Sequence, residues 1–157
     1  DPFEFIQPAF TNIAMANVSK SGVNAKELGF VQDSDPVVFN SRELLYVALC
    51  EARSMAEAGY VPRLSPRNIK VAGRGGIANC EMLLLNMKEG GMISAHDYRV
   101  AKYAAIALCG GDVESGSLVD EEWLLSVERQ LFVDLLKNEK TLQRIEHTLE
   151  TGKPLRN

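Results

Sequence analysis

The residues best suited to a chemical role by type and spacing lie in a glycine-rich stretch near the middle of the chain. Gly73–Ala78 fits the Gly-x-Gly-x-x-Ala pattern of a dinucleotide-binding loop, in which glycines let backbone N–H groups approach a pyrophosphate. That fold also needs a second strand with an acid about twenty residues later. Here two predicted helices separated by Gly90-Gly91 follow instead. We interpret Gly73–Ala78 as a flexible turn leading into a helix, with dinucleotide binding as the weaker alternative.

His96 and Asp97 are neighbours and resemble a base with its carboxylate partner. Adjacent residues of a helix point in different directions, so they rarely form such a dyad. Asp97 instead stands three residues after Ser94, the spacing of a capping box. The second histidine, His147, lies among glutamates on the last predicted helix and is interpreted as solvent-facing.

The carboxylates show no spacing that suits a general acid and a general base. Glu51 and Glu57 are six residues apart on one predicted helix, and Glu121, Glu122 and Glu128 belong to an exposed charged face. A Gly-x-Ser-x-Gly nucleophile elbow is also absent from the sequence. The sequence therefore predicts no catalytic, cofactor-binding or metal-ligating residue in this chain.

The three cysteines, Cys50, Cys80 and Cys109, are far apart in sequence and stand among apolar residues. We interpret them as buried thiols in a reducing compartment. Both histidines are isolated, so no zinc-ligand spacing forms. The first residues do not have the pattern of a signal segment, and we expect a cytoplasmic protein.

Apolar residues recur at three- and four-residue spacing, which predicts helices along most of the chain. Glycines mark helix ends at Gly29, Gly59 and Gly152, and N-cap residues mark the starts at Ser21, Asn40, Ser94, Asp120 and Asn138. Pro8 should lie in the first turn of its helix or kink it. The pattern favours a mainly α fold of six or seven helices with at most two or three short strands. The helices are expected near residues 3–14, 22–28, 41–58, 76–88, 95–109, 121–135 and 139–151. A short extended piece is expected at 30–31, and the apolar stretch 69–71 is too short to assign.

The length of 157 residues and the 46% hydrophobic content suit one domain with a real core. We predict a single helical domain over residues 1–157. It comprises helices over 1–58, a Pro- and Gly-rich connection over 59–75, and a C-terminal helical region over 76–157. Because the chain opens with Asp1 and not with Met, we expect it to be part of a longer protein.

The net charge of −4 is concentrated in the last third of the chain. Residues 1–111 hold 11 basic and 11 acidic groups, whereas residues 112–157 hold 6 basic and 10 acidic groups. Without a basic stripe we expect no nucleic-acid partner. No apolar run approaches the ~20 residues of a membrane span, so we expect no such span.

Two parts of the chain resemble known enzymes of fatty-acid β-oxidation. Val18–Val31 is similar to a stretch of the enoyl-CoA hydratase (crotonase) family, with Phe30 in place of the usual Leu. The family's next extended piece and long helix are matched by Val37–Phe39 and Asn40–Ala58. The part from residue 90 on resembles the C-terminal end of long bacterial 3-hydroxyacyl-CoA dehydrogenases with a fused enoyl-CoA hydratase module, and the likeness as a whole covers about residues 10–157. The motifs that carry this second resemblance are Gly90-Gly91, Ile93-Ser94, His96-Asp97, Leu108–Asp112, Glu121, Trp123–Leu125, Glu128-Arg129, Thr141, Arg144-Ile145 and Thr151–Asn157.

The resemblance implies that the parent enzyme hydrates trans-2-enoyl-CoA and then oxidises the 3-hydroxyacyl-CoA with NAD. It also implies that the hydratase's acid and base glutamates and the NAD-binding module lie upstream of this region. No catalytic residue can therefore be carried onto this chain. In such enzymes the C-terminal helices cover the acyl-CoA site and contact other subunits, so the expected partners are the upstream domains, acyl-CoA held by the parent, and further copies of the chain.

Our hypothesis is that the chain is a C-terminal segment of that enzyme and is inactive alone. The missing half should leave an apolar face open and cause self-association, most simply a two-fold dimer. A stand-alone helical protein-interaction module is the alternative and predicts a stable monomer with a polar surface.

Overall fold

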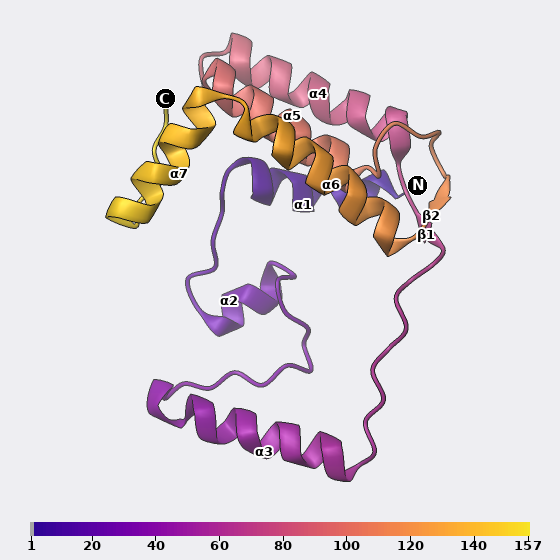
Figure 1. Ribbon diagram of the computed structural model, residues 1–157, viewed down its shortest axis with the longest axis vertical. Coiled ribbons are helices and arrows are strands. Elements are labelled where there is room, and N and C mark those ends of the chain that lie inside the picture. The colour runs from indigo at the N-terminus through magenta and orange to yellow at the C-terminus, as the bar shows by residue number, and fades with distance from the viewer. Residues whose placement is uncertain (1) are drawn as a thin grey trace. The chain divides into compact units, whose positions relative to one another are not determined.

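The computed structural model describes residues 2–157, which form seven α-helices, one 3-10 helix and two short strands (Figure 1). This confirms the predicted mainly α fold. The described residues divide into two compact units: those up to Ala16 together with Ser65–Asn157, and Asn17–Leu64. The single domain predicted over 1–157, with its divisions at 58 and 75, stays a prediction. In chain order the elements are α1 (Phe3–Ala14), α2 (Gly22–Glu27), η1 (Ser41–Glu43), α3 (Leu44–Glu57), β1 (Ile69–Lys70), α4 (Gly73–Glu89), α5 (Ala95–Leu108), β2 (Leu118–Val119), α6 (Glu121–Leu136) and α7 (Glu139–Thr151).

Helix α5 is the central element of the first unit. It contacts α1, α4 and α6, and α7 packs against α6 (Figure 1). Two small residues of α5, Ala101 and Ala105, are buried, and small side chains let neighbouring helices approach closely. Phe10 of α1 and Leu84 of α4 complete the centre of the core. Pro8 lies inside α1, beyond its first turn. The sequence allowed either the first turn or a position inside the helix.

A two-stranded antiparallel sheet lies beside the start of α4, and its strands are separated in the chain by α4 and α5 (Figure 1). Ile69 of β1 pairs with Val119 of β2, and Lys70 pairs with Leu118. Only Val71 and Ala72 separate β1 from α4, so the pairing of β1 with β2 helps to position the start of α4. Behind it Gly110 has a φ of +89°, and a Cβ there would lie 2.6 Å from the Cβ of Val71, so this close approach requires glycine.

The second unit contains α2, η1 and α3. Ser21 caps α2 by accepting a hydrogen bond from the Asn24 N–H at 3.0 Å, as predicted. Asn40 caps η1 through the Arg42 N–H, and its side-chain amide donates to Glu43. No residue of α3 is buried in this unit. The prediction of a buried Cys50 was therefore wrong, because its apolar helix face has no neighbour within residues 17–64.

The short apolar segments between the helices have different outcomes. Residues 30–31 and 37–39 form no strand, whereas Ile69–Lys70 does. The sequence of each short segment could not show whether it forms a strand, because a strand exists only where a partner strand supplies hydrogen bonds. Within residues 2–157, no helix has the length and apolarity needed to cross a membrane.

Candidate functional site

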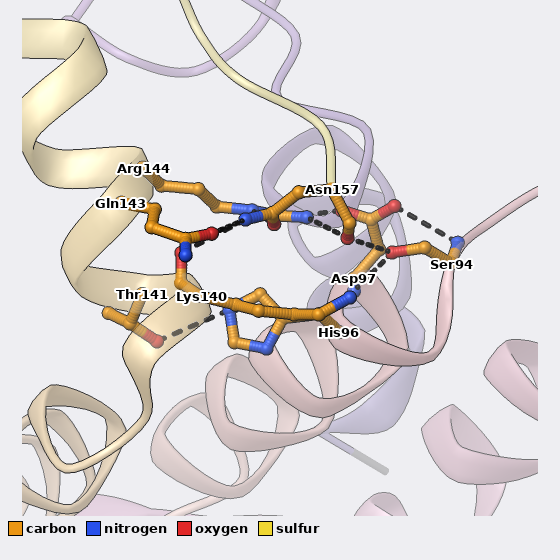
Figure 2. A network of polar contacts seen from close by, with 8 residues as sticks. All are labelled: Ser94, His96, Asp97, Lys140, Thr141, Gln143, Arg144 and Asn157. Atoms are coloured by element: carbon orange, nitrogen blue, oxygen red, sulfur yellow. Dashed lines mark hydrogen bonds and ion pairs between the residues drawn. The ribbon is translucent and has the colours of Figure 1, made fainter.

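Residues from distant parts of the chain form a polar cluster where α5, α7 and the last residues meet. Figure 2 shows the α5 residues on one side, the α7 residues on the other, and Asn157 between them. We call this cluster the polar clamp. Six of its members belong to the motifs that carry the resemblance to the dehydrogenases, and the fold brings these six together. Its members are Ser94, His96, Asp97, Lys140, Thr141, Gln143, Arg144 and Asn157.

The α5 side of the polar clamp is a complete capping box. The Asp97 N–H donates to Ser94 Oγ at 3.1 Å, and the Ser94 N–H donates to Asp97 Oδ2 at 3.0 Å. These two bonds satisfy backbone donors that the start of a helix leaves open. The prediction that Asp97 faces Ser94, and is not a partner of His96, is confirmed.

Arg144 joins the two helices and the end of the chain. Its Nη1 lies 2.8 Å from Asp97 Oδ1, and its Nε donates to Asn157 Oδ1 at 2.8 Å. Ser94 Oγ and Arg144 Nη2 both donate to the backbone oxygen of Asn157, at 3.1 and 3.3 Å. Asn157 Nδ2 in turn donates to Gln143 Oε1 at 2.9 Å. The last residues are therefore held against α5 and α7 by charge-assisted bonds.

The environment of the polar clamp lowers the pKa of both Asp97 and His96. Burial would raise the pKa of Asp97, but the Ser94 hydrogen bonds and the Arg144 guanidinium outweigh it and lower that pKa. His96 is only 4% exposed, and its Nε2 lies 3.2 Å from Thr141 Oγ1. Burial lowers the pKa of His96, and the nearby positive charges of Arg144, Lys140 and Arg99 lower it further. Near neutral pH Asp97 is thus a carboxylate and His96 a neutral imidazole.

A cavity of about 180 Å³ lies beside the polar clamp. Ile13, Ile93, Val100 and Leu155 supply apolar lining, and the Asp97–Arg144 pair forms part of its wall. Because the Arg144 guanidinium already bonds Asp97 and Asn157, its donors serve this internal pair. The arrangement fixes the end of the chain to α5 and α7.

The glycine motif at Gly73–Ala78 lies inside α4, whose first turn begins at Gly73. The predicted start near Gly76 and the predicted flexible turn were therefore wrong. The Gly73 N–H donates to the Cys109 carbonyl at 2.8 Å, and the Arg74 N–H donates to the Val113 carbonyl at 2.9 Å. Gly73 has a φ of +55°, and a Cβ there would meet the Val113 backbone oxygen. These N–H groups and this space are used by the 109–114 loop, so they do not fit a pyrophosphate.

The carboxylates that the sequence singled out lie apart from the polar clamp. Glu51 and Glu57 are exposed on α3, where Glu57 pairs with Arg53, and the three glutamates of α6 are exposed. A different cluster was missed: Glu81 of α4 accepts hydrogen bonds from Tyr98 and Lys102 of α5. The Lys102 hydrogen bond lowers the pKa of Glu81. No sequence signal pointed to this cluster, because its members are 17 and 21 residues apart and pair only across two helices.

Cys80 and Cys109 are both fully buried, as predicted. Burial raises the pKa of Cys109 to about 12. A thiol with so high a pKa supplies almost no thiolate, the reactive form, at neutral pH. His147 is half-buried on α7. In residues 2–157, His, Cys, Asp and Glu side chains form no group of three or more that could hold a metal ion.

Comparison with known proteins relates the whole chain to part of an enzyme. No protein-family model and no solved structure matches it. All 157 residues align at 39% identity with a protein of Bacillus subtilis (strain 168) described as a probable 3-hydroxyacyl-CoA dehydrogenase. The alignment covers 20% of that relative, so the chain spans about a fifth of its length. The chain is therefore similar, from end to end, to one part of a longer protein described as a dehydrogenase.

Proposed function

We propose that the chain is a C-terminal segment of a 3-hydroxyacyl-CoA dehydrogenase that also carries an enoyl-CoA hydratase module and acts in cytoplasmic fatty-acid β-oxidation. The observation that carries the proposal is the 39% identity over all 157 residues to one fifth of a protein described as a probable 3-hydroxyacyl-CoA dehydrogenase. The parent would hydrate trans-2-enoyl-CoA and oxidise the resulting 3-hydroxyacyl-CoA with NAD. Its upstream domains would hold both the NAD and the acyl-CoA.

Within that parent, the segment would serve the fold, cover the acyl-CoA site and contact other subunits, without a catalytic residue of its own. The contacts of its chemistry-bearing side chains support this role. His96 is buried against Thr141, Arg144 is bonded to Asp97 and Asn157, and Glu81 is bonded to Lys102. The N–H groups of Gly73 and Arg74 are bonded within the chain and do not fit NAD. These groups stabilise the segment, which leaves the reactions to the parent's other domains.

An activity assay and a complementation assay test the proposal together. The purified 157-residue chain is expected neither to hydrate crotonyl-CoA nor to reduce NAD with a 3-hydroxyacyl-CoA. The B. subtilis relative, truncated by the fifth that matches the chain, is expected to lose activity and to regain part of it when the chain is added in excess. Hydration of crotonyl-CoA by the chain alone would contradict the inactive role.

The complementation assay also separates the proposal from a stand-alone interaction module. Such a module would leave the truncated relative unchanged at every concentration of the chain. Bovine serum albumin at the same mass concentration serves as the control for non-specific stabilisation. Recovery with the chain and not with albumin is the result that the proposal requires.

A further inference from the structure

A groove of about 470 Å³ runs along the first unit, where the end of α1, the second half of α5 and the first half of α6 meet. Ile13 is 49% exposed and Leu125 is 46% exposed, so solvent reaches the apolar side chains of the groove. Its apolar lining consists of Ile13, Ala104, Ala107, Leu108, Leu124 and Leu125.

The shape of the groove suits a helix. Ala104 and Ala107 come from α5, and their small side chains allow the backbone of an occupant to approach closely. Ile13 comes from α1, and Leu124 and Leu125 come from α6. An apolar trough between helices typically binds the apolar face of an amphipathic helix through residues at positions i, i+3, i+4 and i+7.

The charged residues that line the groove have one sign. They are Glu121 and Glu128 of α6, both exposed, seven residues and therefore about 10 Å apart along the helix axis. Across residues 2–157, neither takes part in an ion pair. An occupant with two basic residues spaced by two helical turns would complement this pair of charges.

We propose that the groove receives a basic amphipathic helix from the part of the longer protein that this chain lacks. This inference rests on the proposed function. Eight residues line the groove, whereas a stable interface between separate proteins uses roughly 20–30 residues a side. A segment of the same polypeptide is held at an effective concentration of the order of millimolar, so a small contact suffices for it. The size of the groove thus favours an occupant from the same polypeptide over an independent partner.

Titration with peptides tests the inference on the full 157-residue chain. The probes are overlapping 20-residue peptides that cover the B. subtilis relative outside its matched fifth. A peptide with an apolar stripe and two basic residues seven apart is expected to shift the methyl NMR signals of Ile13, Leu124 and Leu125. The indole signal of Trp123, the one tryptophan of the sequence, lies next to Leu124 and reports the same event. If no peptide shifts these signals, the inference is overturned.

Charge reversal provides the sharper test. In the double variant Glu121→Lys/Glu128→Lys, the Kd of the binding peptide should rise about tenfold, since two attractive pairs become repulsive. A peptide whose two basic residues are replaced by Glu should bind this variant better than the original chain. Added salt should shrink both differences. The matched control Glu146→Lys/Glu150→Lys makes the same charge change on exposed residues of α7 and should leave the Kd unchanged. Equal binding by the two double variants would overturn the inference.

Complementation of the truncated relative separates this inference from the proposed function. If the groove variant and the original chain restore activity equally, the proposed function stands and the groove inference fails. If neither restores activity, the proposed function fails, while the peptide titration still decides the groove. Methyl shifts that depend on chain concentration without any peptide would assign the groove to a second copy and overturn the inference.

Discussion

Arg144 Nη1 lies 2.8 Å from Asp97 Oδ1, so one ion pair ties α7 to the first turn of α5. Both side chains are less than a quarter exposed, and the same guanidinium also holds Asn157. The pair thus joins α5, α7 and the end of the chain.

Replacing Arg144 by Ala should destabilise the chain by about 2–3 kcal/mol, because Asp97 and Asn157 both lose a charge-assisted partner in a partly buried place. Urea unfolding followed by circular dichroism measures this loss. Arg53→Ala is the control, since the Arg53–Glu57 pair is exposed on α3 and its loss should cost less than about 1 kcal/mol. Equal losses in the two variants would contradict the role given to Arg144.

The stability of the chain should fall as the pH drops below about 6.5. Burial and neighbouring positive charges lower the pKa of His96 from its ordinary value of 6.5. The unfolded chain therefore takes up a proton at His96 more readily than the folded chain does. The contribution of neutral His96 to stability is therefore complete above pH 6.5 and is lost as the pH falls from 6.5 through the lowered pKa of His96 in the folded chain.

Thermal unfolding at pH 7.5, 6.5 and 5.5 checks this prediction. His96→Gln keeps a polar group near Thr141 but does not titrate, so the fall over this pH range should become smaller in that variant. His147→Gln, which changes the histidine outside the polar clamp, should retain the fall. If the pH dependence disappears with His147→Gln and persists with His96→Gln, the assignment is wrong.

Gly73→Ala should be far more costly than Gly29→Ala, although both glycines have a positive φ. At Gly29 nothing lies within 4 Å of an added Cβ, so only the backbone conformation opposes alanine, at about 1 kcal/mol. At Gly73 an added Cβ also meets the Val113–Glu114 backbone, so the loss should reach about 2–4 kcal/mol. The urea midpoints of the two variants measure the difference. A much lower midpoint for Gly73→Ala than for Gly29→Ala shows that Gly73 is required for packing, and equal midpoints show that only its backbone conformation matters.

Thiol labelling should divide the cysteines into one fast and two slow groups. Ellman's reagent should react quickly with Cys50, which is exposed, and with Cys80 and Cys109 only as fast as the chain unfolds, because both are buried. Cys50→Ser should remove the fast phase and leave the slow phase unchanged. A fast phase of three thiols in the folded chain would show that the core around Cys109 is open.

Self-association, expected from the sequence, should depend on the apolar face of α7. Leu142 and Leu149 lie two turns apart on that helix, and Leu149 is 82% exposed. Multi-angle light scattering should show a mass that rises with concentration, and Leu142→Ser/Leu149→Ser should reduce this rise. Leu64→Ser, at a residue 93% exposed outside the helices, should leave it unchanged. A monomer at every concentration of the original chain would contradict the prediction.

The sequence by itself determined the local structure, because helix caps depend on residues three or four positions apart. Ser94, Asp120 and Asn138 begin helices as predicted, and Gly152 ends α7 with a φ of 68°. Where a residue depends on a distant neighbour, only the tertiary structure decided. The α4 start moved to Gly73 because the 109–114 loop accepts its N–H groups, and Cys50 is exposed because its apolar helix face has no neighbour in its own unit. The Glu81–Lys102 pair forms only when α5 packs against α4, and the polar clamp forms only when α7 and the end of the chain meet α5. Spacing along the sequence carries no information about such contacts between helices.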